Sequence, residues 1–225
     1  SGYTDIAIGI ALLLGFRFPQ NFNKPYCATS IRDFWSRWHM TLSRWLRDYV
    51  YIPLGGNKKS FLGNRFIWLN VVITFLVGGL WHGSNLTFVV WGLYHGLLLS
   101  IERPLRKYLV RNNIEIPKFL KQVITFHLVT FGWILFNSET FDKAKILTSR
   151  IFTDFSFSES KLTLAIFILI IAGIGLQFIR ESFSSRLLEM LSAKPIFVQA
   201  LFYGTCLFLL STFSDNVSAF LYGFF

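Results

Sequence analysis

Charged residues and cysteine are scarce in this sequence. Only 15% of its 225 residues are Asp, Glu, Lys or Arg, whereas a soluble globular chain has about 25%. This shortage excludes an ordinary soluble domain. Cys27 and Cys206 are the two cysteines and lie far apart in the sequence, so we predict free buried thiols rather than a disulfide framework.

The signatures of several enzyme classes are also missing. The sequence has no Gly-x-Ser-x-Gly segment, which is the nucleophile motif of serine hydrolases. None of its four histidines lies three or four residues from another, and no Cys or acidic residue completes a cluster with them. We therefore predict no metal site.

Apolar and aromatic residues are abundant instead. Hydrophobic residues make up 53% of the chain, and 26 Phe and 7 Trp contribute to an aromatic content of 18%. This composition is typical of a protein surrounded largely by lipid. Because the apolar residues form long runs, we predict an all-α fold, namely a polytopic transmembrane helical bundle.

Six apolar segments are predicted membrane spans. A helix that crosses a bilayer needs about 20 apolar residues, or fewer where it is broken or buried in protein. The segments lie at 3–16, 66–80, 86–101, 122–136, 162–179 and 196–213. They predict a single membrane domain over 1–225. The sequence opens with Ser1 rather than Met and runs directly into an apolar stretch at 6–16, so we expect the chain to be the C-terminal portion of a longer protein.

The net charge of +10 is unevenly distributed. All but four of the 22 Lys and Arg lie in three segments, at 17–65, 102–121 and 180–194. Loops rich in Lys and Arg face the cytoplasm, so these three segments are predicted on that side. The excess of positive charge is interpreted as a topology signal, and no nucleic-acid partner is expected.

The segment 27–53 has the pattern of an amphipathic helix. Large apolar side chains recur every three or four residues from Ile31 to Tyr49, and most charged residues fall on the other side. Ser30 followed by Asp33 resembles a capping box. We predict an interfacial or re-entrant helix with His39 on its apolar face. A plain surface anchor is the alternative.

His82 is the first candidate for a catalytic residue. It lies in a polar break, 81–85, between the second and third predicted spans, and Gly78, Gly79 and Gly83 flank it. Such a broken helix is tolerated at membrane depth only where it is buried in protein or lines a cavity. An imidazole there can act as general base for a hydroxyl that attacks a thioester. A histidine that only bonds neighbouring helices is the alternative.

The other histidines and the basic loop have further possible roles. His39 can orient an acyl donor or assist His82, whereas His95 is predicted to make an interhelical hydrogen bond and His127 to be structural. Four basic residues form a candidate cytoplasmic anion site, with a solvated loop as the alternative; they are Arg44, Arg47, Lys58 and Lys59.

Three ordered strings carry a family resemblance. They are DFWSRWHMTLS at 33–43, WLRDYVYIPLGGN at 45–57 and GLWHG at 79–83. Together they resemble the membrane-bound O-acyltransferase (MBOAT) family, and within it the bacterial branch of alginate and peptidoglycan O-acetylases. The resemblance covers roughly residues 15–105.

The resemblance implies a site and a reaction. His82 matches the family histidine that lies in a buried tunnel, and His39 matches the second one. Trp38 and Trp81, with the four basic residues, are expected to bind the donor. The implied reaction moves acetyl from a cytoplasmic thioester, acetyl-CoA, towards hydroxyls of a cell-envelope polysaccharide such as alginate or peptidoglycan. No bound cofactor is expected.

The resemblance also implies a location and partners. It places a multi-pass protein among the lipids of the bacterial cytoplasmic (inner) membrane, and it implies a periplasmic acetyltransferase partner. Two alternatives stay open. One is a D-alanyl transferase of the teichoic-acid type, although YIPLGG at 51–56 favours the acetylases. The other is a transporter or channel subunit whose broken helix lines a substrate path.

Overall fold

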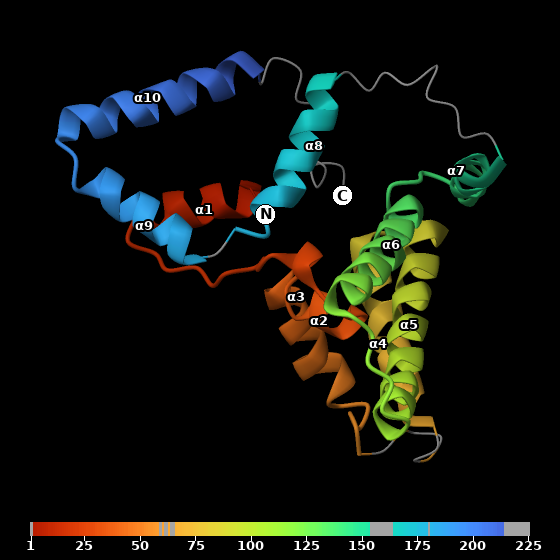
Figure 1. The fold of residues 1–225 in the computed structure, drawn as a ribbon. Coiled ribbons are helices and arrows are strands. Elements are labelled where there is room, and N and C mark those ends of the chain that lie inside the picture. Colours follow the sequence, from red (N-terminus) through yellow and green to blue (C-terminus); the bar gives the residue numbers. More distant parts are fainter. Residues whose placement is uncertain are drawn as a thin grey trace. The chain divides into compact units, whose positions relative to one another are not determined.

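The computed structural model describes residues 2–58, 60, 63, 66–153, 164–179 and 181–213. Within these residues every regular element is a helix (Figure 1), which confirms the all-α prediction. The chain divides into two compact units, Ser1–Gln177 and Phe178–Phe225, and each is described by itself.

The first unit contains the first four predicted spans, all but the last two residues of the fifth, and several shorter helices. Its elements are α1 (Gly2–Leu13), η1 (Pro25–Cys27), α2 (Ile31–Trp35), α3 (Met40–Leu46), η2 (Arg47–Tyr51), α4 (Ile67–His82), α5 (Leu86–Arg111), α6 (Lys118–Phe136), α7 (Phe141–Thr153) and α8 (Leu164–Leu176). The second unit contains α9 (Glu181–Ser192) and α10 (Ile196–Phe213). The helices α7 and α9 were not predicted, because their charged residues hide them among the loops.

The helices α4 and α5 form a closely packed antiparallel hairpin, with α6 beside α5 (Figure 1). Glycines make the close approach possible. A Cβ added to Gly79 would lie 2.3 Å from the carbonyl oxygen of Phe88, and one added to Gly92 would lie 2.3 Å from that of Phe75. The backbones of α4 and α5 are therefore in direct contact at Gly79 and Gly92, where larger residues would hold the helices apart.

The structure corrects the prediction of a helix broken at 81–85. His82 is the last residue of α4 rather than part of a polar break, and only 83–85 separate α4 from α5. Gly83 has a φ of 153°, which a residue with a side chain rarely adopts. Asn85 caps α5, since its side chain accepts a hydrogen bond from the Thr87 N–H at 3.4 Å. The chain thus turns back at His82.

The prediction of one amphipathic helix over 27–53 is wrong in its continuity. The helix starts as expected, because Ser30 Oγ accepts a hydrogen bond from the Asp33 N–H at 3.0 Å. It stops at Trp35, and His39 adopts a left-handed backbone with a φ of 46° before α3 begins. The apolar stripe is split accordingly. Leu46 is buried, whereas Tyr49 is 69% exposed.

The core of the first unit lies where α2 packs against α5 and α6. Ile31 and Phe34 of α2 are buried with Ala28 and with Val129 of α6. Glu102 of α5 fixes the start of α2, because its Oε2 accepts a hydrogen bond from the Ile31 N–H at 2.6 Å. The short helix α2 is therefore held by an apolar face and by a carboxylate at its N-terminus.

One described helix, α6, is both long and apolar enough to cross a membrane, with a mean hydropathy of 1.5. Four shorter apolar stretches accompany it, at Gly2–Leu13, Ile67–His82, Ile166–Leu176 and Ile196–Leu209. The six-span bundle and the single domain over 1–225 therefore stay predictions.

Candidate active site

A cavity of about 680 Å³ lies in the first unit, between α2, α3, η2 and the α4–α5 hairpin. One part of its wall is aromatic and apolar and includes His82, Phe75 and Trp91. The other part is basic. Five arginines line it, namely Arg32, Arg44, Arg47, Arg103 and Arg106.

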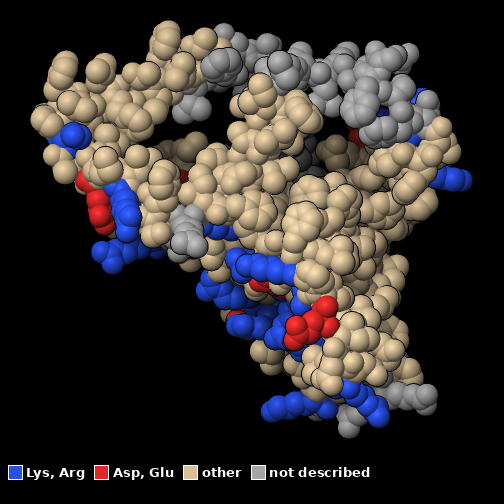
Figure 2. Space-filling view, in the orientation of Figure 1, with Lys and Arg blue, Asp and Glu red and all other residues tan. Residues whose placement is uncertain are grey.

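The cavity extends along α5 from its buried middle to its basic end. Trp91 and Arg103 both line it, and their separation along the helix corresponds to about 18 Å at 1.5 Å per residue. All five arginines are exposed, and Figure 2 shows Lys and Arg side chains gathered over the region of α2 and α3. The cavity therefore connects a positively charged surface with a buried histidine.

His82 lies in an aromatic box at the turn of the hairpin. Its side chain is buried, and its ring centroid lies 4.9 Å from that of Phe136 and 5.3 Å from that of Trp91. The indole N–H of Trp91 is closed to solvent and has no hydrogen-bond acceptor among the described residues. These packed rings restrict water and fix the plane of the imidazole.

His39 lies near His82, and the rings of both histidines contact Trp81. The Trp81 ring centroid is 6.1 Å from that of His39 and 4.9 Å from that of His82. Burial lowers the pKa of His39 below its ordinary value, so its imidazole is neutral at neutral pH. The left-handed turn between α2 and α3 thus brings the two predicted site histidines to the same indole ring.

Polar side chains brace the basic part of the cavity. Asn57 Oδ1 accepts hydrogen bonds from the Tyr51 hydroxyl at 2.9 Å and from Arg103 Nη1 at 3.0 Å. Arg47 Nε is paired with Asp48 at 2.7 Å. Arg103 is therefore oriented by a neutral amide, and its remaining N–H groups keep their capacity to bind an anion.

The predicted donor-binding residues separate into two groups. Arg44 and Arg47 line the cavity, and Trp81 contacts both histidine rings. Trp38, in contrast, stacks on Phe34 in the core, with ring centroids 5.6 Å apart. Lys58 is exposed and is not part of the cavity wall. Lys59 lies outside the described residues.

Several cavity residues were missed from the sequence. Arg103 and Arg106 lie one helical turn apart at the basic end of α5, and Arg32 follows the start of α2. The clustering of Lys and Arg at 102–121 was a signal for Arg103 and Arg106. It was assigned to topology only, since nothing local in the sequence shows that this segment meets the segment around Arg44.

The remaining histidines have structural surroundings. His95 is completely buried, and its Nδ1 accepts a hydrogen bond from Trp35 Nε1 at 3.4 Å, which confirms the predicted bond between helices. His127 is exposed, and its Nδ1 bonds the Val123 carbonyl within α6 at 2.8 Å. In the described part of the chain, no three His, Cys, Asp or Glu side chains gather as metal ligands do.

These features define a class of protein. It is helical, it exposes apolar helices, and one cavity connects its buried histidine with a basic surface that suits an anionic ligand. The chain belongs to the membrane-bound O-acyltransferase (MBOAT) family, whose sequence model matches residues 1–141. The match contains both site histidines and all five cavity arginines, and it confirms the resemblance found in the sequence.

Three relatives indicate the branches of the family to which the chain is similar. It is 42% identical to the "Probable alginate O-acetylase AlgI" of Azotobacter vinelandii over 86% of the chain and 39% of that protein. It is 43% identical to the peptidoglycan O-acetyltransferase of Helicobacter pylori over 67% of the chain and 28% of that protein.

The third relative represents a different reaction. The teichoic acid D-alanyltransferase of Bacillus subtilis is 38% identical over 63% of the chain and 38% of that protein. The chain thus spans less than two fifths of the length of each of these relatives.

Proposed function

We propose that the full-length protein is a membrane O-acetyltransferase that moves acetyl from a cytoplasmic thioester towards hydroxyls of a cell-envelope polysaccharide. One observation carries this proposal, namely that a single cavity is lined by five arginines and by the buried His82. The acetylases of Azotobacter vinelandii and Helicobacter pylori, which resemble the chain over most of its length, support the choice of acetyl.

The cavity suits a donor such as acetyl-CoA, which joins a phosphate-bearing head to a thioester by a long arm. Guanidinium groups bind phosphate through charge-assisted hydrogen bonds. With the phosphates at Arg103 and Arg106, the arm follows α5 towards Trp91 and His82, about 18 Å away along the helix axis. The apolar wall excludes water from the thioester and limits its loss by hydrolysis.

His82 acts as the general base in the proposed reaction. Its imidazole takes the proton of the acceptor hydroxyl while that oxygen attacks the thioester carbonyl. The new C–O bond forms, the C–S bond breaks, and the proton passes to the departing thiolate. His39, whose ring also contacts Trp81, orients the acyl group. The acceptor is a sugar hydroxyl or a hydroxyl of a periplasmic partner that passes the acetyl group on.

The proposed setting is the bacterial cytoplasmic membrane, crossed several times. The apolar helix α6, the shorter apolar helices and the exposed apolar side chains support a lipid environment. The turn 83–85 and the connection from α6 to α7 are in contact, since the Asn85 amide donates to the Glu139 carbonyl. Both are far in sequence from the basic segments, in line with a basic cytoplasmic side and an opposite outer side.

A D-alanyl transferase is the second candidate, because one relative has that activity. The two reactions share a thioester donor and a hydroxyl acceptor, and they differ in the charge of the acyl group. D-alanyl carries an ammonium group. Among the described residues that line the cavity, Glu102 is the only acidic one, and its carboxylate is already engaged by the start of α2. This wall favours a neutral acyl group.

The test uses the purified full-length protein in detergent with two donors, acetyl-CoA and a D-alanyl thioester. Release of free thiol is followed with and without a polysaccharide acceptor, and the variant His82→Ala provides the blank. We expect turnover of acetyl-CoA that rises with the acceptor and is absent from the blank. Turnover of the D-alanyl thioester alone would support the second candidate, and turnover of neither donor would contradict both.

A further inference from the structure

The backbone at His39 is strained, and its own side chain does not hold it. His39 has φ 46° and ψ 51°, the left-handed region that a residue with a Cβ rarely occupies. Its Nδ1 is buried, and its side chain makes no capping hydrogen bond with α3. Such a conformation persists only where the surroundings impose it.

His39 occupies the N-cap position of α3 but does not cap the helix. An N-cap side chain ordinarily accepts a hydrogen bond from the second or third N–H of its helix, and Asn, Asp, Ser and Thr serve best. The His39 side chain makes no such bond. The first N–H groups of α3 must therefore find their acceptors elsewhere.

Asn21 supplies those acceptors from the segment that follows α1. Its backbone carbonyl accepts a hydrogen bond from the Met40 N–H at 2.9 Å. Its side-chain Oδ1 accepts one from the Thr41 N–H at 3.0 Å and a second from the Thr41 hydroxyl at 2.9 Å. Asn21 thus caps the first N–H groups of α3, although it lies outside the helix.

The neighbours of Asn21 hold the other side of the turn. The Asn23 N–H donates to the Arg37 carbonyl at 2.9 Å. The Phe22 ring centroid lies 4.9 Å from that of Trp38 and 6.1 Å from that of His39. Residues 21–23 therefore contact the chain before, at and after His39.

The sequence pattern alone favours a different conformation, namely one continuous helix through His39. The apolar stripe from Ile31 to Tyr49 has the spacing of one continuous helix. A continuous helix would place His39 in ordinary right-handed backbone and would turn its ring away from Trp81. The bonds from Asn21 favour the bent form, because they are available only when α3 starts at Met40.

We propose that Asn21 is a positioning residue that holds His39 in the left-handed turn beside Trp81 and His82. The consequence for catalysis rests on the proposed function, whereas the positioning itself does not. Asn21 replaces the capping group that the N-cap residue would normally provide, and the imidazole of His39 stays available to the site.

The test compares three variants of the full-length protein in detergent. Asn21→Ala removes the side-chain acceptor of both Thr41 bonds, and Asn21→Asp keeps an acceptor oxygen there. Asn23→Ala is the matched control, because the bonds described for Asn23 use only its backbone atoms. Modification of His39 by diethyl pyrocarbonate is measured by mass spectrometry, and kcat and KM are measured with acetyl-CoA. Thermal unfolding midpoints report folding.

For Asn21→Ala we expect faster modification of His39 by about threefold or more. We also expect a fall in kcat of about 10- to 100-fold with KM changed by less than about twofold, since a small misplacement of a site group costs that much in rate. Asn21→Asp should restore most of both properties, and Asn23→Ala should match the wild type.

Equal His39 modification and equal kcat in Asn21→Ala and the wild type would overturn the proposal. So would equal losses in Asn21→Ala and Asn23→Ala, which would show a general effect of the segment. If Asn21→Ala does not accumulate, Asn21→Leu replaces it, because it has a similar volume and lacks the acceptor oxygen for both Thr41 bonds, and an unchanged His39 would again overturn the proposal. If no full-length protein turns over acetyl-CoA, the proposed function fails and the modification rates still decide on Asn21.

Discussion

The glycines of the α4–α5 hairpin and the glycine of α10 have opposite surroundings. A Cβ at Gly79 or Gly92 would lie 2.3 Å from a carbonyl oxygen, whereas nothing lies within 4 Å of the position at Gly204. The family match covers residues 1–141, so it contains the α4–α5 hairpin but not α8, α9 or α10. Detailed packing is thus required where the candidate site lies.

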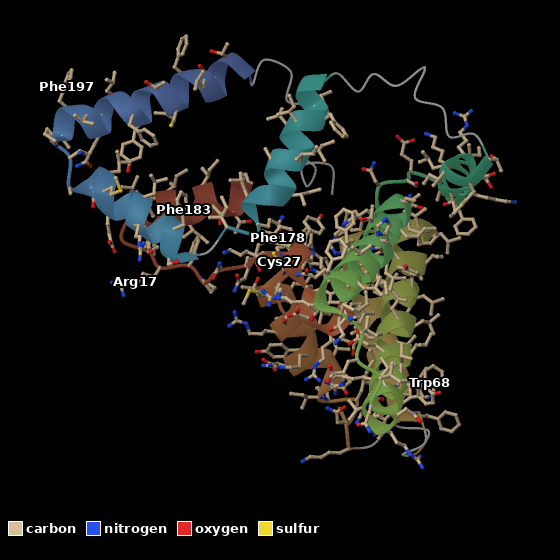
Figure 3. The ribbon with its side chains drawn as sticks, in the orientation of Figure 1. Arg17, Cys27, Trp68, Phe178, Phe183 and Phe197 are labelled. Atoms are coloured by element: carbon tan, nitrogen blue, oxygen red, sulfur yellow. The ribbon has the colours of Figure 1, made fainter. Side chains whose placement is uncertain are left out.

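The side chains differ in the same way. Phe34 of the first unit is 1% exposed, whereas Phe183 and Phe197 of the second unit are 60% and 76% exposed (Figure 3). A helix that faces lipid needs sufficient length and apolar residues, but it needs no particular partner for each side chain. The part of the first unit around the α4–α5 hairpin is therefore constrained residue by residue, whereas α1, α8 and the second unit are constrained mainly by composition.

The largest expected effect comes from a methyl group placed in each region. Gly92→Ala forces Cβ against the Phe75 carbonyl, and overpacking of this kind costs about 1–3 kcal/mol. Gly204→Ala meets open space and should stabilise α10 by roughly 0.5–1 kcal/mol. Thermal unfolding of the full-length variants in detergent measures both. Equal thermal unfolding midpoints for the two variants would contradict the difference in packing between the hairpin and α10.

The second effect concerns charge rather than packing. Arg103→Ala removes a guanidinium from the cavity wall, and we expect KM for acetyl-CoA to rise about tenfold, because a hydrogen bond to a charged group contributes roughly 1.5–3 kcal/mol and this site is partly open to water. Arg186→Ala, on the exposed face of α9, is the control and should leave KM unchanged. Steady-state kinetics of the two variants decide, and an unchanged KM for Arg103→Ala would exclude it from the donor site.

A third, smaller effect is expected at the start of α2. Glu102→Ala removes the acceptor of the Ile31 and Arg32 N–H groups, and loss of a helix cap costs about 1 kcal/mol. Glu189→Ala on α9 removes a carboxylate for which the structure shows no such bond, so its cost should stay below about 0.5 kcal/mol. Unfolding midpoints that fall equally would refute the anchoring role of Glu102.

Sequence reasoning predicted the long apolar helices well, because their composition determines them locally. The segment 196–213 matches α10 in both limits. The prediction from the sequence was wrong at His39. The apolar spacing favours a continuous helix there, whereas the hydrogen bonds that interrupt it are accepted by Asn21, which is distant along the chain. A local pattern cannot show a cap supplied by a distant residue.

The candidate site was predicted in part for a related reason. His82 and His39 were recognised from their polar character in apolar surroundings and from the family strings. Arg103 was missed as a cavity residue, because its contact with Asn57 depends on how the hairpin meets η2. Trp38 was assigned to the donor, yet it stacks on Phe34, since an aromatic side chain is equally suited to core and cavity.

The smallest expected effect is a shift in titration. Burial lowers the pKa of His39 from its ordinary value of 6.5, so the neutral imidazole should persist to a more acidic pH. Diethyl pyrocarbonate reacts with the neutral form, and the rate of His39 modification in the full-length protein should therefore reach half its maximum below pH 6.5. A midpoint at or above pH 6.5 would contradict the burial of this ring.

Acetyl transfer by His82 is best measured as the O-acetyl content of cell-envelope polysaccharides in cells that carry the full-length gene, compared with cells that carry His82→Ala at equal protein level. We predict that ester-linked acetate disappears from one polysaccharide fraction in the variant, because transfer has lost its general base. Unchanged acetate in every fraction would contradict the central claim that His82 catalyses acetyl transfer.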